Sequence, residues 1–509
     1  MTKSDSAPSL RWRLLRWGFI GLAILITLLA LTWGEENTRG RHQWEGYQRR
    51  LLAAGEKLDL ASFVPPPVPD EQNFAMTPFL APLFDFRPDR QPGESAWRDT
   101  NALNRANSFA RVLGSPKSNG EGRDNRRMVD LISRSAAMAE AAKREGAPPP
   151  DRAAAARQII ADLQSSQPVI DEIRAAAQRP YARFNIRYGD GPATLLPHLA
   201  VMKGLANLLH LRALAELELG QSDAAIADLA LVRRTADAIQ NEPFLISGLV
   251  RLAIIQLELQ PIWEGLAQHR WSDAQLATLQ TNLGRIDLLA DYAHGMRGER
   301  AGCNEMLTKM RTHKGNEIDP ATGFDNPAYY ALPGGWLYQN QLVINRMHQD
   351  VILAGVDPVA QRVDPALYTD DSALTRELNS GFMPYKILAR LLLPAVSKSA
   401  LKYAYGQTGV NEAIVACALE RYRLAHGEFP EKLDALTPTL VARLPHDLIE
   451  GEPLKYRRLA PDHFLVYSIG WNEKDDGGVP GDIKKSTSNT QHPDTTTGDW
   501  VWDSAAVAK

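Results

Sequence analysis

Apolar residues recur every three or four positions over a long part of the chain, which is the period of an α-helix that buries one face. The pattern runs through residues 126–399, and LLHLRALAELELG at 208–220 is a clear example of it. We therefore expect residues 126–399 to form an all-helical domain.

Helix boundaries are visible within this region. Gly220 stands where a helix would end, because glycine tolerates the left-handed backbone that often follows the last turn. Ser222 and Asp223 follow it with side-chain oxygens that can cap free backbone N–H groups. The start SDAAIADL at 222–229 returns as SDAQLATL at 272–279. Two similar helix starts predict stacked helical hairpins.

Residues 208–243 resemble one tetratricopeptide unit, although Ala213 stands where that repeat has a glycine in its first helix. The positions that carry the resemblance are Gly220, Ala225, Ile226, Leu229 and Pro243. The resemblance implies a helical region whose concave surface would bind a protein partner. The alternative is a compact helical bundle without such a partner.

The helical period is lost before residue 126. Residues 56–100 contain VPPPVPD and RPDRQPG, and we expect an extended, partly ordered linker there. Residues 37–55 would form a short helix that continues from the N-terminal segment.

The C-terminal part combines one long helix with short strands. The helix over 400–426 ends before Gly427, and Pro430 prevents its return. PLKYRRL at 453–459 and HFLVYSIG at 463–470 are typical of strands, and GDWVWDS near the C-terminus adds an edge strand. We expect a long helix followed by a small antiparallel sheet.

An apolar segment near the N-terminus suits a single membrane span. No charged residue lies between Trp17 and Trp33, and Leu14 and Leu15 extend the segment toward the roughly 20 residues that cross a bilayer core. The sequence predicts that the chain contacts the lipid bilayer through residues 14–33. The alternative is a cleaved signal peptide, which has the same order of basic, apolar and polar regions.

The charges around this segment predict its orientation. Basic residues come before it and acidic residues after it, so the positive-inside rule keeps the N-terminus in the cytoplasm. These residues are Lys3, Arg11, Arg13 and Arg16 on one side and Glu35 and Glu36 on the other. We expect a single-pass protein of a bacterial inner membrane with its bulk in the periplasm.

Together these patterns predict a mainly α fold with an N-terminal transmembrane helix. The expected units are a cytoplasmic tail and signal anchor (1–34), a short helix and proline-rich linker (35–125), an α-helical domain of stacked hairpins (126–399), and an α+β domain with a long helix and a small antiparallel sheet (400–509).

Composition narrows the possible partners. The chain has 57 Lys and Arg against 60 Asp and Glu, a formal net charge of -3, which argues against nucleic acid because such binding rests on clustered basic residues. Cys303 and Cys417 are its two cysteines. A location outside the cytoplasm would permit them to pair, whereas their helical context favours two buried free thiols.

The sequence contains no familiar catalytic motif, and we expect no enzyme. The nearest polar group is DYAHGMRGERAGCNE, which contains His294 and Glu299. Five residues apart on a helix, these two side chains do not directly face each other, and such stretches are usually solvated or ion-paired. An extracytoplasmic hydrolase with its site in the helical domain is the alternative.

The C-terminal part contains, in this order, ALERYRLAHGEFP, the LDAL segment, LPHDLIEGEPLKYRR, FLVYSIGWNEKDDGG and a closing acidic loop. By these segments it resembles the globular domain of type II secretion major pseudopilins. The resemblance implies a long helix, a small sheet and a loop that binds calcium through carboxylates, a serine or backbone carbonyls.

Carried over by position, the calcium ligands would lie in and around SIGWNEKDDGGVPGD, with Asp499 as a remote additional ligand. They are Ser468, Asn472, Asp475, Asp476 and Asp482. Calcium takes six to eight oxygen ligands in flexible geometry, which Asn and Asp side chains in a glycine-bent loop provide. The alternative is a plain turn, since Asn, Asp and Gly are common turn residues.

A pilin-like filament subunit is a further hypothesis, because Gly18-Phe19 follows basic residues as in a pilin cleavage site. Ala23 stands where that family has a glutamate, and the long helical region separates the C-terminal domain from the span. The sequence therefore favours an anchored structural or adaptor protein, linked to envelope or secretion assemblies.

Overall fold

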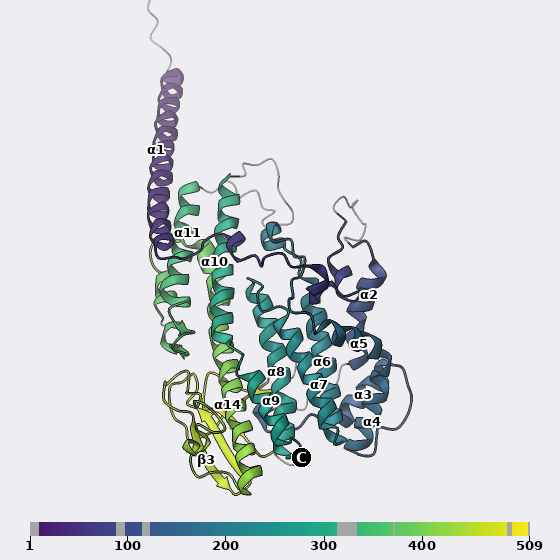
Figure 1. Ribbon diagram of the computed structural model, residues 1–509. Helices are drawn as coiled ribbons and strands as arrows, with labels where there is room; N and C mark the ends of the chain where they lie inside the picture. Colours follow the sequence, from purple (N-terminus) through teal and green to yellow (C-terminus); the bar gives the residue numbers. More distant parts are fainter. Residues whose placement is uncertain are drawn as a thin grey trace, which may run out of the picture.

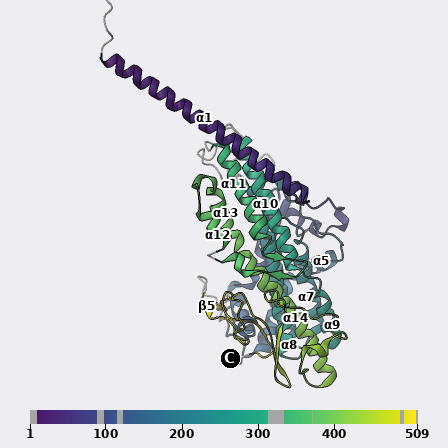
Figure 2. The same cartoon turned by 90° about the vertical axis from the view of Figure 1, so that its left-hand side faces the viewer.

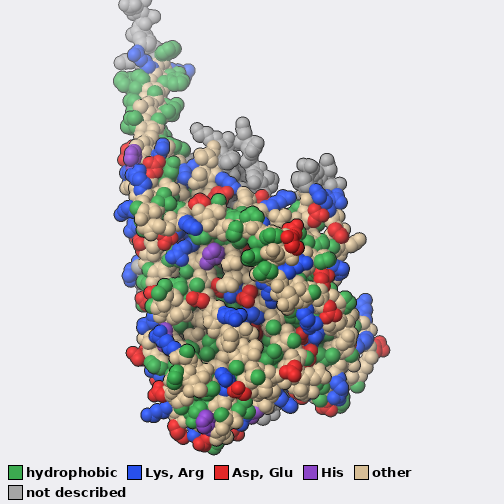
Figure 3. Space-filling view, viewed as in Figure 1, with side chains coloured by type: hydrophobic (Ala, Val, Ile, Leu, Met, Phe, Trp, Pro, Cys, Tyr) green, Lys and Arg blue, Asp and Glu red, His purple; other side chains and the backbone are tan. Residues whose placement is uncertain are grey.

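The first element is the long helix α1, Leu10–Ala53, whose first half projects from the body of the molecule (Figure 1). The computed structural model describes residues 10–87, 97–114, 123–312, 333–369, 372–485 and 491–506. Apolar side chains surround the projecting part, while charged and apolar side chains mix over the visible surface of the body (Figure 3). By length and composition this part suits a membrane span or a signal sequence.

The second half of α1 packs along α11, Gly334–Met347. The helices approach closely at two glycines, because a Cβ on Gly40 would lie 2.7 Å from the carbonyl oxygen of Gly335. Asn37 Oδ1 accepts a hydrogen bond from the Gly335 amide at 2.5 Å. The helix expected at 37–55 is therefore confirmed as a continuation of the apolar helix.

Helices form most of the body, as the apolar period predicted, and α3 packs on α4, α6 on α7, α7 on α8 and α10 on α11 (Figure 1). Their bounds are α2 Thr100–Phe109, α3 Leu131–Ala141, α4 Arg152–Leu163, α5 Gln167–Ala176, α6 Pro197–Glu218, α7 Ser222–Asp237, α8 Leu245–Ala267, α9 Asp273–Leu283, α10 Leu288–Thr312, α12 Ala373–Asn379, α13 Ile387–Ser397 and α14 Ser399–His426. α8 is long and apolar enough to cross a membrane but is mostly buried in this core.

The two similar helix starts lie in contact. Gln275 Nε2, in the first turn of α9, donates to Ser222 Oγ at 3.0 Å and to Asp223 Oδ1 at 2.7 Å. The prediction that these oxygens cap their own helix is wrong in this detail, since α7 begins at Ser222 without a side-chain cap. They instead tie the α7 and α9 starts together.

The proline-rich segment is packed rather than extended over its described residues 56–87, whereas most of the RPDRQPG motif lies outside the described residues. The described segment forms the short 3-10 turns Leu60–Phe63, Asp70–Gln72, Phe74–Met76 and Ala81–Phe84. Phe74, Phe79, Leu80 and Leu83 are all buried in the main core. The expectation of an extended linker missed this, because large apolar side chains between the prolines gain free energy by burial without any helical period.

The C-terminal sheet has the predicted strands, which pair antiparallel in the order β3-β4-β7. β3 is Lys455–Ala460, β4 is His463–Ser468 and β7 is Trp500–Asp503, the expected edge strand. Two small ribbons complete the strands, β1 Val356–Asp357 with β2 Arg362–Val363, and β5 Ile483–Lys485 with β6 Gln491–Pro493.

α14 joins the helical body to this sheet. It contacts α8, α9 and α10 as well as β4 and β7, and Figure 2 shows it beside α8 and α9. Across the junction, Trp263 Nε1 on α8 donates to the carbonyl oxygen of Asp503 at 2.7 Å. Residues from both predicted domains, including Trp263 and Trp502, belong to one continuous apolar core.

Candidate functional sites

The loop after β4 holds most of the predicted calcium ligands, but Ser468 points elsewhere. Ser468 is buried, and its Oγ donates to Asp447 Oδ1 at 2.9 Å. Asp447 Oδ2 also accepts the Ile469 amide at 2.9 Å. Asp447 was not predicted as a site residue, although it lies in the LPHD segment that carried the resemblance. Its two contacts fix the start of the loop.

Asn472, Asp475 and Asp476 form a local turn. Asn472 Nδ2 donates to Asp476 Oδ2 at 2.8 Å, and Lys474 Nζ lies 3.0 Å from Asp476 Oδ1. Asp475 Oδ1 accepts the Gly477 amide at 2.9 Å, and Gly477 has a φ of 76°, which favours glycine. These three side chains therefore form the local hydrogen bonds that are expected of turn residues.

Asp499, at the β7 end, closes the turn from the other side. It is buried, its Oδ1 accepts the Asp476 amide at 3.1 Å, and its Oδ2 accepts the Gly478 amide at 2.5 Å. Burial raises the pKa of Asp499, the two amides lower it, and the charges of Asp475 and Asp476 raise it. Asp499, directly before β7, thus binds the loop that contains Asn472, Asp475 and Asp476.

Asp482 lies outside this turn. Its backbone carbonyl accepts the Asp494 amide at 2.8 Å, and its side chain is exposed. Within the described part of the chain, no three His, Cys, Asp or Glu side chains are placed to hold a metal ion together. The structure therefore gathers some of the expected oxygen ligands and separates Ser468 and Asp482 from them.

His294 and Glu299, both on α10, have separate partners. His294 Nε2 donates to the Asn241 carbonyl at 3.3 Å, while Glu299 Oε1 accepts the Leu245 amide at 2.9 Å at the start of α8. Burial lowers the pKa of His294 and raises that of Glu299. Both contacts hold helix ends, and they do not bring an acid and a base together. Cys303 and Cys417 are both free.

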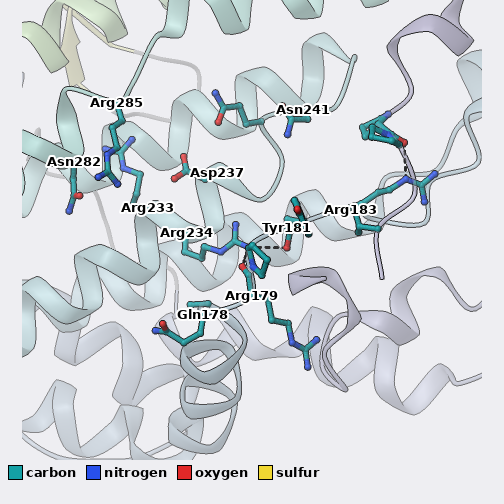
Figure 4. A pocket seen from close by; sticks show the side chains of 17 residues that line it. Gln178, Arg179, Tyr181, Arg183, Arg233, Arg234, Asp237, Asn241, Asn282 and Arg285 are labelled. Carbon is teal, nitrogen blue, oxygen red and sulfur yellow. Dashed lines mark hydrogen bonds between the residues drawn. The ribbon is translucent and has the colours of Figure 1, made fainter. Parts of the chain in front are cut away.

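The structure contains a cavity of about 670 Å³ that no sequence motif indicated (Figure 4). The packed proline-rich segment and the loop after α5 line one part of it, and α7 and the connection after α9 line the rest. Its wall contains five arginines against one carboxylate, Asp237. The arginines are Arg179, Arg183, Arg233, Arg234 and Arg285. They are scattered over more than a hundred positions, so only the folded chain reveals the cluster.

Three of these arginines hold backbone segments in place. Arg179 Nη1 donates to the Asn73 carbonyl at 2.9 Å, and Arg183 Nε donates to the Pro65 carbonyl at 2.9 Å. Arg234 Nη2 donates to the carbonyls of Arg179 and Tyr181, at 2.9 and 3.0 Å. Burial lowers the pKa of Arg234. The cavity wall is therefore tied to the main chain around it.

The other two arginines differ in burial. Arg233 is only 9% exposed, and its Nη2 lies 2.7 Å from Glu258 Oε2. Its Nε, Nη1 and Nη2 form no hydrogen bond with the described residues, so the contact with Glu258 is an ion pair only. Arg285 is exposed. Asp237, the single carboxylate of the wall, pairs with Arg251 Nη1 at 2.9 Å, which leaves the cavity with a positive potential.

No protein-family model, curated protein or solved structure matches this chain. The resemblances to pseudopilins and to a tetratricopeptide unit therefore stay predictions from the sequence.

Proposed function

We propose that this protein is a single-pass, membrane-anchored structural or adaptor protein, held in a bacterial inner membrane through residues 14–33 with its body in the periplasm. The observation that carries the proposal is the continuity of α1. The same helix that exposes an apolar stretch continues into turns that pack on α11 through Gly40. A helix fixed at one end in the body presents its apolar stretch at a defined position.

This continuity supports a retained anchor over a cleaved signal peptide. Cleavage soon after Trp33 would cut a helix whose next turns already contact the body. There Tyr385 Oη donates to Glu36 Oε2 at 2.6 Å and Gln339 Nε2 donates to Gln43 Oε1 at 2.6 Å. The basic residues before the span support a cytoplasmic N-terminus.

The C-terminal domain would act as a pseudopilin-like module of this adaptor. Support comes from the order of its elements, since α14 is followed by β3, β4, an acidic glycine-bent loop and β7. We propose that calcium binds this loop at Asn472, Asp475, Asp476 and Asp499 and draws these side chains together, since no three acidic side chains of the described residues already surround one point. These side chains are the hard oxygen ligands that calcium prefers. Burial and then the charges of Asp475 and Asp476 raise the pKa of Asp499, and a bound cation would offset both effects.

The test of the anchor is the intact mass of the full-length protein from the membrane fraction, with extraction at alkaline pH. We expect the mass of the uncleaved chain and retention in the membrane pellet. A mass that lacks the residues up to the end of the apolar stretch would show a signal peptide instead. A mass that lacks residues 1–18 would favour the pilin-like filament subunit.

A further inference from the structure

We propose that the arginine-lined cavity binds a small ligand with at least two anionic oxygen groups, either phosphates or carboxylates. This inference goes beyond the anchoring function and does not depend on it. The cavity of about 670 Å³ is large enough for such a molecule, since ligand sites commonly occupy about 300–1,000 Å³.

The charge of the wall is the first argument. Five guanidinium groups repel one another, and the one carboxylate among them, Asp237, is already paired with Arg251. A ligand with two negative groups would offset this repulsion. Arginine also suits the role, because its planar fork forms two parallel hydrogen bonds to a carboxylate or phosphate.

The unsatisfied donors of Arg233 are the second argument. Nε and Nη1 of this buried side chain lack a hydrogen-bond partner among the described residues. A buried charged donor without a partner costs free energy, and buried polar groups are nearly always satisfied. The ion pair with Glu258 lies at one end of the guanidinium group, and the remaining donors are themselves buried. An anion in the cavity would satisfy them once Arg233 turns its guanidinium group toward the space that this residue lines.

The rigidity of the wall is the third argument. Arg183 and Arg234 are fixed by bonds to the carbonyls of Pro65, Arg179 and Tyr181, yet each uses only one of its three nitrogens in these bonds. Figure 4 shows Arg233, Arg285 and Asn282 on one side of the cavity and Arg183 on the other, with Arg234 between them. A prearranged wall lowers the entropy cost of binding.

The test measures thermal unfolding and calorimetric binding of the full-length protein in detergent micelles. Inorganic pyrophosphate and citrate serve as the phosphate and carboxylate probes, each compared with sodium chloride at the same ionic strength. We expect one probe to raise the melting temperature more than the salt control, and the better probe identifies the source of the anionic groups. Equal effects of both probes and of salt would overturn the proposal.

Variants locate the binding. Arg285→Gln removes an exposed charge from the cavity. We expect this substitution to raise the Kd of the better probe on the order of tenfold. Arg270→Gln, an exposed arginine outside the cavity, is the matched control and should bind as the wild type does. Arg233→Lys keeps a positive charge beside Glu258 but removes the planar fork, so it should also weaken binding.

If Arg233→Lys fails to fold, Arg285→Gln still decides the question. Unchanged binding in Arg285→Gln, or an equal loss in Arg270→Gln, would show that the probe binds elsewhere or through net charge. Either result would overturn the proposal and would leave the test of the membrane anchor unaffected.

Discussion

At the scale of single residues, buried charges connect segments that are far apart in the sequence. Glu264 is an example, since its Oε2 lies 2.7 Å from Nη2 of the half-buried Arg152, whose Nε lies 2.7 Å from Glu218 Oε2. Glu264 also accepts the Val129 amide at 2.8 Å. One buried carboxylate thus joins α8 to α4 and to the chain before α3.

Glu264→Gln tests this connection. The substitution keeps the size of the side chain but leaves Arg152 with Glu218 as its remaining charged partner. Removing one partner of a fully buried pair costs about 3–5 kcal/mol, and the half-buried Arg152 makes the cost smaller here. We expect a clear fall in the melting temperature of the full-length protein. Glu71→Gln, at an exposed position, should change it little. Equal melting temperatures for the two variants would contradict the role of Glu264.

His348 gives the protein an acid-sensitive element. It is 1% exposed, and burial lowers its pKa from 6.5 to about 4. The unfolded chain takes up the proton below about pH 6.5 while the folded chain does not, so stability is lost as the pH falls from about 6.5 to about 4. At pH 5 the loss is about 2 kcal/mol relative to neutral pH.

His348→Gln should remove this contribution, so its melting temperature should fall less than that of the wild type between pH 7.5 and pH 5. His426→Gln, at an exposed position on α14, controls for the substitution itself. A variant that loses as much stability as the wild type on acidification would show that His348 does not carry the effect.

At the scale of elements, the close packing of α1 on α11 is the contact that fixes the projecting helix. Gly40→Leu would place a side chain where even a Cβ atom would lie 2.7 Å from the carbonyl oxygen of Gly335. Overpacking of this kind costs about 1–3 kcal/mol. Gly46→Leu is the matched control, because a Cβ at Gly46 meets nothing within 4 Å.

We expect Gly40→Leu to lower the melting temperature and to speed proteolysis between α1 and the body, whereas Gly46→Leu leaves both unchanged. Indistinguishable variants would mean that α1 does not depend on this contact. Such a result would also weaken the argument that the apolar stretch is held as a fixed anchor.

The acidic loop after β4 provides the calcium test. Binding to the folded state alone raises stability by about 2.7 kcal/mol at a calcium concentration one hundred times the Kd. We expect calcium to raise the melting temperature relative to chelator, and Asp475→Ala/Asp476→Ala to abolish the rise. Asp482→Ala, outside the turn, should keep it. No calcium response in the wild type would establish a plain turn.

The elements differ in how far the sequence predicted them. The described helices within 126–399, the helix over 400–426 and the C-terminal strands follow local periodicity, and the structure confirms them. The expectation that 126–399 is all-helical is wrong in one detail, since the short β1-β2 ribbon lies within this range. The packed proline-rich segment was missed because its apolar side chains are buried by segments that are distant in the sequence, without a helical period of their own. The cavity was missed for the same reason, since no local pattern shows that Arg233 and Arg285 line the same space.

At the scale of the whole molecule, the predicted boundary near residue 400 does not separate two cores. α14 begins at this boundary and is buried against helices on one side and the sheet on the other. The local sequence suggests a boundary because helical periodicity gives way to strands, whereas tertiary packing joins the two parts. We therefore expect the body and the C-terminal sheet to unfold together.

Trp263→Phe tests this expectation, because the substitution removes the indole N–H that donates to the Asp503 carbonyl across the junction. Leaving a buried acceptor unpaired costs about 1–3 kcal/mol. In calorimetry of the full-length protein we expect one transition that shifts to lower temperature, and Trp33→Phe, in the exposed part of α1, should leave it in place. Two transitions, of which Trp263→Phe shifts only one, would instead define a C-terminal domain that is stable by itself. A single shared transition would also mean that calcium bound at the loop after β4 stabilises the helical body, because ligand binding to one part of a cooperative unit stabilises the whole unit.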